Sequence, residues 1–257
     1  MSKRIGLILS GGATFLLLAA PASGAISTIA SEVIGGPSDG LIAAGTEVEL
    51  ADLEPGEGVL VINVGGITLT LKDFTVQPSP LSAPDITDFS VLAVENTDNG
   101  FVGIRILVDG LEVFGVDDSE NSTLRYTVVV GGGPGAGVDG ASLAFSDSPG
   151  ITLTGIGNEA VVSETIIESA DLNNTVSLSI FADETDDKLE DEETFEAISE
   201  FFVTKDLGVS GDGAGASVAI TEIDELYSVV PEPAAYAFFF GLATLALGLL
   251  RRRRMAR

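Results

Sequence analysis

The stretch FSVLAVENTDNGFVGIRILVDGLEVFGV, residues 89–116, decides the fold class. Three apolar runs, 89–95, 101–108 and 111–116, are separated by the dipeptides Asn99-Gly100 and Asp109-Gly110. Asn-Gly and Asp-Gly supply the positive φ angles that tight hairpins need. The stretch therefore predicts a meander of three antiparallel strands.

Apolar and polar residues alternate in the same way along much of the chain. In residues 67–72 the apolar side chains fall on odd positions, as on one face of a strand. The phase then changes to Phe74 and Val76, which predicts a β-bulge near Lys72 and Asp73. Similar runs occur at 59–64, 124–130, 141–145, 151–154, 160–167, 176–180, 200–205 and 217–223.

These runs amount to about twelve short strands with turn signals between them, the pattern of an antiparallel β-sandwich. Two segments fall outside the pattern. Residues 131–140 are rich in glycine and are expected to form a loop, whereas the acidic segment 186–199 is expected to form a loop or one short helix. The fold class is therefore all-β.

Composition excludes several classes of function. The chain has 257 residues, no His, no Cys and no Trp, with 12 basic and 39 acidic residues and a formal charge of −27. Without His and Cys it cannot build a Ser-His-Asp or Cys-His nucleophile, a His/Cys zinc site, an Fe–S cluster or a disulfide. The charge argues against a nucleic-acid partner, which requires clustered Lys and Arg.

The N-terminal residues have the pattern of a secretory signal peptide. Lys3 and Arg4 precede an apolar run at 5–20, and small residues follow at 21–25. We place the signal peptide at residues 1–24; cleavage after Gly24 and cleavage after Ala25 both fit. An uncleaved signal anchor is the alternative, although the apolar run is short for a bilayer crossing of about 20 residues.

The C-terminal residues combine a motif, an apolar segment and a basic cluster. Pro231, Glu232 and Pro233 precede the uncharged segment 234–250, and Arg251, Arg252, Arg253 and Arg254 follow it. As an α-helix this segment would be about 25 Å long, so it is expected to form a single transmembrane helix. The arginines are costly to translocate and are expected to act as a cytoplasmic stop, leaving the residues before the helix outside.

This three-part C-terminal segment, residues 230–257, resembles the PEP-CTERM sorting signal of Gram-negative bacteria that secrete polysaccharide. The resemblance implies export by signal peptidase and the general secretion machinery, and a transient stay in the inner membrane. It also implies recognition of Pro231, Glu232 and Pro233 by an exosortase, a membrane-embedded Cys transpeptidase that removes the segment. An ordinary stop-transfer helix after a chance Pro-Glu-Pro is the alternative.

Residues 25–229, the body between these ends, are even more acidic than the whole chain. Five basic and 38 acidic residues remain there, a formal charge of −33. Carboxylates are ligands that Ca²⁺ prefers, and Asp183, Asp186 and Asp187 are candidate ligands for it, although they lack EF-hand spacing. No other cofactor is expected.

The function expected from the sequence is that of an exported, non-enzymatic protein. Its destination would be the cell surface or the extracellular polysaccharide matrix of a biofilm, with exopolysaccharide as a candidate partner. The alternative is a carbohydrate- or calcium-binding module of that matrix. A glycoside hydrolase would need two carboxyl groups with unequal pKa values. In so acidic a chain, however, pairs of acidic residues occur by number alone, so their presence does not indicate an enzyme.

Overall fold

The computed structural model describes residues 30–230, apart from 38–39, 43–44, 81, 97–98, 134, 147–149, 156 and 184. The expected signal peptide and the whole C-terminal segment 231–257 therefore lie outside the described residues. Within the described part, no helix has both the length and the apolar character needed to cross a membrane.

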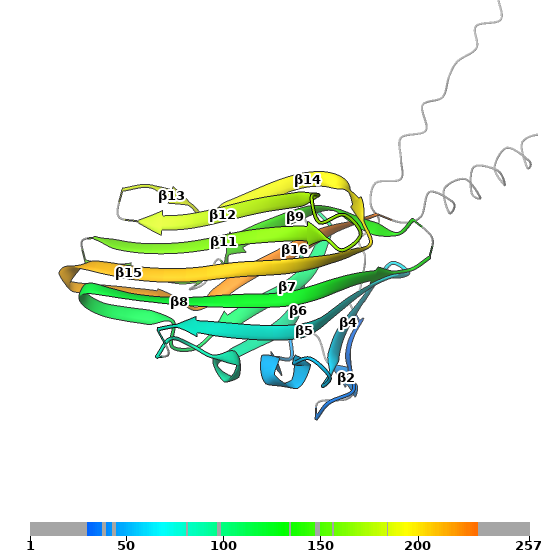
Figure 1. Ribbon diagram of the computed structural model, residues 1–257, viewed down its shortest axis with the longest axis horizontal. Helices are drawn as coiled ribbons and strands as arrows, with labels where there is room; N and C mark the ends of the chain where they lie inside the picture. The colour runs from blue at the N-terminus through cyan, green and yellow to red at the C-terminus, as the bar shows by residue number, and fades with distance from the viewer. Residues whose placement is uncertain are drawn as a thin grey trace, which may run out of the picture.

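Two antiparallel sheets pack face to face as a β-sandwich, as predicted, and they appear as front and back layers in Figure 1. Sheet A has the order β13-β12-β11-β15-β8-β5-β4-β1-β2, with β10 also paired to β15. Sheet B has the order β14-β9-β16-β7-β6-β3. The chain also forms two short 3₁₀ turns, η1 (Leu50–Leu53) and η2 (Ile86–Asp88).

The strands of sheet A are β1 (Ala30–Ile34), β2 (Gly40–Ile42), β4 (Val59–Val64), β5 (Ile67–Ser79), β8 (Glu112–Gly131), β10 (Ile151–Thr154), β11 (Asn158–Glu168), β12 (Thr175–Asp183), β13 (Asp187–Lys188) and β15 (Glu200–Ile220). The strands of sheet B are β3 (Val48–Glu49), β6 (Phe89–Asn96), β7 (Phe101–Val108), β9 (Gly137–Phe145), β14 (Glu190–Ile198) and β16 (Glu222–Val230).

The alternation seen in the sequence produces the core between the sheets. Along β5, for example, Ile67, Leu69 and Leu71 are buried while the residues between them are partly exposed. The inward residues of both sheets form one continuous apolar cluster. Two aromatic contacts lie within it: Phe74 stacks on Tyr126 with ring centroids 4.8 Å apart, and Phe201 meets Tyr227 edge-on at 5.5 Å.

The β-bulge predicted near Lys72 and Asp73 is confirmed. Pairing between β5 and β8 is regular up to Lys72 and resumes at Thr75 in a shifted register. Asp73 has a φ of 59°, in the left-handed region that only a minority of non-glycine residues adopt. The extra residue returns Phe74 to the inward face, so the change of phase in the sequence has a direct structural cause.

The meander predicted over residues 89–116 is correct for its first two strands and wrong for the third. Strands β6 and β7 form the expected antiparallel hairpin across Asn99-Gly100. After Gly110, however, the chain crosses to sheet A, where β8 pairs with β15 and β5. The reason is that β7 already has β6 on one side and β16 on the other, so it offers no free edge.

The expectation of a loop or short helix at 186–199 is also wrong. Most of this segment is β14, which pairs with β9 at the edge of sheet B, and residues 187–188 form β13. Only Ile198 at its end is fully buried. The many exposed carboxylates suit an edge strand, because charge there discourages pairing with a further chain.

Two strands are longer than the sequence pattern predicts. Strand β8 has 20 residues and joins two predicted strands, and β15 has 21 residues and continues through a glycine-rich stretch. They lie side by side across the middle of sheet A and run most of the length of the molecule (Figure 1). Together they determine the outer surface of that sheet.

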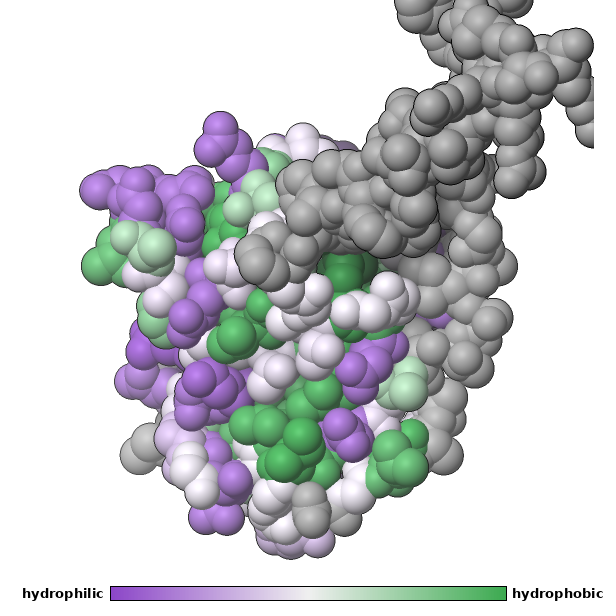
Figure 2. Space-filling model, turned by 90° about the vertical axis from the view of Figure 1, so that its right-hand side faces the viewer, coloured by the Kyte–Doolittle hydropathy of each residue, from purple (hydrophilic) through white to green (hydrophobic). Residues whose placement is uncertain are grey.

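The surface is hydrophilic with scattered apolar residues. Figure 2, which shows one end of the molecule, has hydrophobic residues in small groups among hydrophilic and neutral ones. The most exposed large apolar side chains of the described residues are Leu41, Leu172 and Phe114, at 85%, 68% and 64%. They come from different parts of the chain, as is usual for single apolar residues on a protein surface.

Candidate functional site

The outward face of sheet A carries many short polar side chains, together with some charged and apolar ones such as Lys72 and Phe202. Successive rungs cross the strands in register, and one rung contains Thr75, Arg125, Thr204, Thr165 and Ser177. Threonine suits such positions because it is β-branched and tolerates a half-buried pleated surface. This rung therefore carries four hydroxyl side chains and one guanidinium group across five hydrogen-bonded strands.

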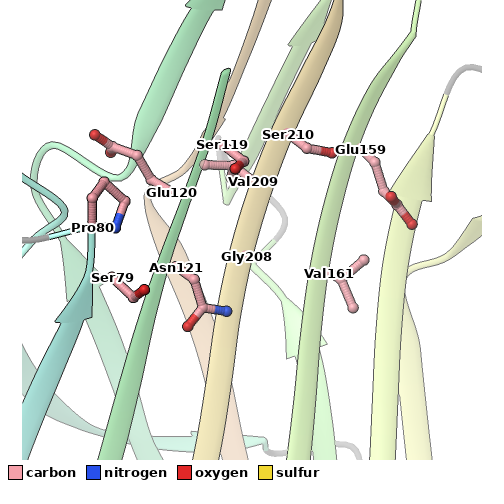
Figure 3. Close-up of a pocket in the computed structure, with 10 residues that line it drawn as sticks. All are labelled: Ser79, Pro80, Ser119, Glu120, Asn121, Glu159, Val161, Gly208, Val209 and Ser210. Carbon is pink, nitrogen blue, oxygen red and sulfur yellow. The ribbon is translucent and has the colours of Figure 1, made fainter. Parts of the chain in front are cut away.

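A hollow of about 540 Å³ opens on this face. The residues around it come from β5, β8, β15 and β11, and Figure 3 shows how they lie across the strands. The hollow is lined by Ser79, Pro80, Ser119, Glu120, Asn121, Glu159, Val161, Gly208, Val209 and Ser210.

The hollow exists because one rung lacks a side chain. Gly208 on β15 pairs with Asn121 on one side and with Val161 on the other. A Cβ atom at Gly208 would lie 3.4 Å from Asn121 Nδ2 and 4.0 Å from the Val161 carbonyl oxygen. A larger side chain there would therefore occupy the space, and glycine leaves it open between the neighbouring strands.

The lining groups are hydroxyls, one amide and carboxylates, and none of these ten described residues is basic. Hydroxyl, amide and carboxylate groups are donors and acceptors that can hydrogen-bond a neutral polar ligand. Phe181 on β12 pairs with Val161, so an aromatic side chain lies one strand beyond the hollow. The arrangement is suited to a hydroxylated, uncharged ligand rather than to an anion.

Glu120 differs from the other lining residues. Its carboxylate is directed away from the other labelled side chains (Figure 3), and its Oε2 is buried without a hydrogen-bond partner among the described residues. Burial, reinforced by the negative charge of Asp118, raises the pKa of this carboxyl above its usual value. Of the carboxylates around the hollow, Glu159 is the exposed one.

The candidate calcium ligands lie at the turn after β12. Asp183 ends β12, Asp186 lies in the turn and Asp187 begins β13. Asp183 Oδ1 accepts hydrogen bonds from the Thr185 and Asp186 amides and from the Thr185 hydroxyl, which lowers the pKa of its carboxyl. Among the described residues, no three carboxylates converge on a possible metal position. A calcium site here stays a prediction.

A second group of chemically unusual residues lies inside the sandwich. Lys205 of β15, Glu164 of β11 and Glu225 of β16 have completely buried side chains. The Lys205 Nζ contacts Glu164 Oε2 and Glu225 Oε2, so one ammonium position is shared by two carboxyl groups. Beside them, the hydroxyls of Tyr126 and Tyr227 lie 3.0 Å apart and join the two sheets.

Burial determines the ionisation of this internal cluster, defined here as Lys205, Glu164, Glu225, Tyr126 and Tyr227. It lowers the pKa of Lys205 and raises the pKa of Glu225, because a low-dielectric interior disfavours both charged forms. The pKa values of Tyr126 and Tyr227 are raised well above their usual value for the same reason. Burial thus works against the charged forms of both Lys205 and Glu225, whereas their contact with each other works in favour of them.

Carboxyl groups with shifted pKa values often mark active sites, but the two carboxyl groups of this cluster cannot contact a soluble substrate where they are. The side chains of Glu164 and Glu225 are fully buried, and neither residue lines the hollow of Figure 3. A glycoside hydrolase requires its two carboxyls to flank the bond that is cleaved. The cluster is therefore a feature of the core, separate from the outward face.

This cluster is not among the sites predicted from the sequence, although the sequence contains a signal for it. Glu164 occupies a position of the inward series that includes Val162 and Ile166. Lys205 likewise lies between Val203 and Leu207 on the inward face. A charged residue in phase with the apolar positions of a strand is the pattern that identifies a buried charge.

The residues of the expected sorting motif, Pro231, Glu232 and Pro233, and the arginines 251–254 lie outside the described residues. What the structure does describe is the strand that leads to them. Strand β16 lies between β7 and β9 inside sheet B and extends to Val230, the residue before the motif. The folded body thus continues directly up to the predicted signal.

Comparisons with known proteins give distant likenesses only. No family model matches the chain, and neither does any curated protein. Among solved structures, a carbohydrate-binding module, TmCBM61, in complex with β-1,4-galactotriose is 14% identical over 60% of this chain and 88% of the module, with a TM-score of 0.31.

Two enzymes or enzyme-containing proteins are similar at a still lower level. Tailspike protein 4 of bacteriophage CBA120 is 10% identical over 61% of this chain and 19% of its own, with a TM-score of 0.27. A xylanase 10C of Cellvibrio japonicus is 11% identical over 60% of this chain and 27% of its own, with a TM-score of 0.22. Likeness at this level identifies neither a family nor a ligand for the chain.

Proposed function

We propose that the chain is an exported, non-enzymatic β-sandwich protein of the cell surface or extracellular polysaccharide matrix of a Gram-negative bacterium. In this proposal an exosortase recognises the C-terminal segment 230–257 and cleaves the chain within it after export. The observation that carries the proposal is the order of the sequence: two basic residues and an apolar run, then a very acidic body, and then Pro-Glu-Pro, an apolar segment and four arginines.

Two structural features support this proposal. The region between the two ends folds as a sandwich without disulfides, as a chain lacking cysteine must. Its last strand, β16, ends at Val230, so a cut beyond that residue would leave both neighbours of β16 in place. Removal of the tail would therefore not require the body to unfold.

The sorting assignment predicts that Glu232→Ala, or deletion of residues 251–254, leaves most of the protein in the membrane fraction. The first change removes the charged centre of the motif, and the second removes the cytoplasmic stop. Fractionation and the intact mass of the extracellular protein measure the effect. Glu200→Ala, a change at an exposed position of the body, is the control. Normal export of the Glu232→Ala variant would contradict the assignment.

The outward face of sheet A supports a second, more specific function for the same protein, namely binding of a neutral polysaccharide. The observation that favours it is the hollow at Gly208, which is surrounded by hydroxyl, amide and carboxylate groups and has an aromatic side chain one strand away. Sugars are recognised through hydrogen bonds to several hydroxyls at once, and the rungs of serine and threonine extend this possibility along the strands.

Filling the hollow tests this function. Gly208→Leu is expected to weaken retention on native matrix polysaccharide by about tenfold, equivalent to about 1.4 kcal/mol, because the leucine would occupy the space beside Asn121. Thr204→Leu, on the same strand and outward face but outside the hollow, is the matched control. Equal binding of both variants, measured by affinity electrophoresis, would rule out the hollow as the binding site.

A further inference from the structure

The internal cluster places an amine directly against a carboxyl group in the core. Lys205 and Glu164 are partners in the antiparallel pairing of β15 and β11, so their side chains leave the sheet side by side. The Lys205 Nζ contacts Glu164 Oε2, and both side chains are fully buried. Neither oxygen of Glu164 has a hydrogen-bond partner among the described residues, so the contact with Lys205 is its one polar interaction there.

The charges of the cluster do not balance in the ordinary ionised form. Two carboxylates and one ammonium would leave a net negative charge inside an apolar core, where an unpaired charge is costly. One added proton makes the cluster neutral, as ammonium, carboxylate and carboxylic acid. Transfer of the ammonium proton to the carboxylate then gives an amine and two carboxylic acids, also neutral.

We propose that Lys205 and Glu164 are joined by an intramolecular amide bond that forms in the folded protein, with Glu225 transferring the proton. The Lys205 Nζ attacks Glu164 Cδ and the new N–C bond forms. Glu225 accepts a proton from that nitrogen and donates one to the departing hydroxyl, so that the C–O bond breaks and one water molecule leaves. No oxidant, cofactor or second protein takes part.

The position of Glu225 fits this role. It reaches the cluster from β16 in the opposite sheet, and its Oε2 contacts the same Lys205 Nζ that would react. Burial raises the pKa of Glu225 and lowers the pKa of Lys205, so a protonated acid and a nucleophilic amine are both favoured. Glu225 therefore qualifies as a catalytic residue of this self-modification, because it touches a reacting atom.

The surroundings favour the amide over the separated groups. On the two strands, Val162, Ile166, Val203 and Leu207 flank the pair and are fully buried. Such a site excludes water, which would otherwise solvate the amine and hydrolyse the product. Because the fold holds the reacting groups together, the reaction needs no encounter step. The amide also removes two charges from the core.

The experiment is digestion of the denatured full-length chain with trypsin, followed by mass spectrometry. Trypsin does not cut after a lysine whose amine has become an amide. Without the bond, the cuts after Arg125, Lys188, Lys205 and Arg251 give separate peptides 126–188, 189–205 and 206–251. With the bond, 126–188 stays attached to 189–251, and the pair weighs about 18 Da less than its two parts because one water has been lost.

We expect the joined peptide to be the main product from the parent protein and from Lys72→Met, a control in which a partly exposed lysine is removed. Glu225→Gln keeps the side-chain shape but cannot carry a proton, and it is expected to lose the joined peptide almost completely. Free peptide 189–205 from the denatured parent would overturn the proposal, whatever the variants do. If Glu225→Gln gives the joined peptide as completely as the parent, the role of Glu225 in proton transfer is overturned. If the amide links Lys205 to Glu225 instead, Glu164 is not the residue that is attacked.

Discussion

Replacement of Lys205 by methionine is expected to lower the free energy of unfolding by about 3–5 kcal/mol at pH 7, the cost of removing one partner from a buried ion pair. Methionine preserves the length and apolar character of the side chain but leaves two carboxyl groups in the core without a cation. Any covalent bond to Lys205 is lost as well. Urea unfolding of the variant, the parent and the control Lys72→Met measures the difference.

The stability lost in Lys205→Met should depend on pH, and the loss should be smaller at low pH. The pKa of Glu225 in the folded protein lies above 4.5, its unfolded value, because burial disfavours its charge. Its contribution to stability is therefore present below the unfolded pKa and is lost as the pH rises through the folded pKa. Removing Lys205, whose positive charge opposes this shift, strengthens the effect.

The deficit of Lys205→Met relative to the parent should accordingly be smaller at pH 5.5 than at pH 8. Taking the difference between the two proteins cancels the titration of the many surface carboxylates that they share. A deficit that stays constant across this range, or that grows toward acid pH, would mean that the buried carboxyls do not take up protons in the folded variant.

Gly103→Ala is expected to destabilise the protein by about 3 kcal/mol or more and to lower the Tm by about 6–12 °C. Gly103 lies in the middle of β7, opposite Leu226 of β16. A Cβ at this position would overlap the Glu225 carbonyl oxygen and lie 2.9 Å from its carbon and 3.0 Å from Leu226 Cα. These are backbone atoms, so the strands themselves would have to separate.

The matched control is Gly131→Ala at the end of β8. There a Cβ would meet nothing closer than Thr68 Cβ at 3.5 Å, an ordinary van der Waals contact. Calorimetry of the two variants separates the close approach at Gly103 from the general effect of replacing glycine in a strand. Equal Tm values for the two variants would show that β7 and β16 can move apart at little cost.

The local features of the fold were accessible from the sequence, because they depend on neighbouring residues. The change of phase after Lys72 identified the bulge, and Asn99-Gly100 identified the hairpin. The third strand of the expected meander depended instead on whether β7 had a free edge, and that edge is taken by β16, a strand more than a hundred residues later in the chain. The alternation of apolar and polar residues within one segment does not show which distant strand that segment pairs with.

The acidic segment 186–199 shows a different limit. Its sparse apolar residues fit no clear period, and only pairing with β9 makes it a strand. Similarly, β15 continues past Gly208 and Gly211, beyond the strand expected at 200–205, because β8 and β11 pair with it on both sides as far as Gly211. In both cases tertiary hydrogen bonds override local preference.

The candidate sites were accessible to different degrees. The hollow depends on Gly208 being in register with Asn121 and Val161, and three strands must be aligned before that can be seen. The buried positions of Glu164 and Lys205, in contrast, were available from the alternation of their own strands. Their contact with Glu225 could not be predicted from the sequence, since it depends on how the two sheets pack together.

The place of β16 has a mechanical consequence. A pull on whatever follows Val230 acts along a strand that is hydrogen-bonded on both sides, to β7 and to β9. Sliding this strand out requires both ladders to yield together, whereas a terminal strand at an edge could peel away bond by bond. Any tether at this end of the molecule would therefore transmit load to an interior strand of sheet B rather than to an edge strand.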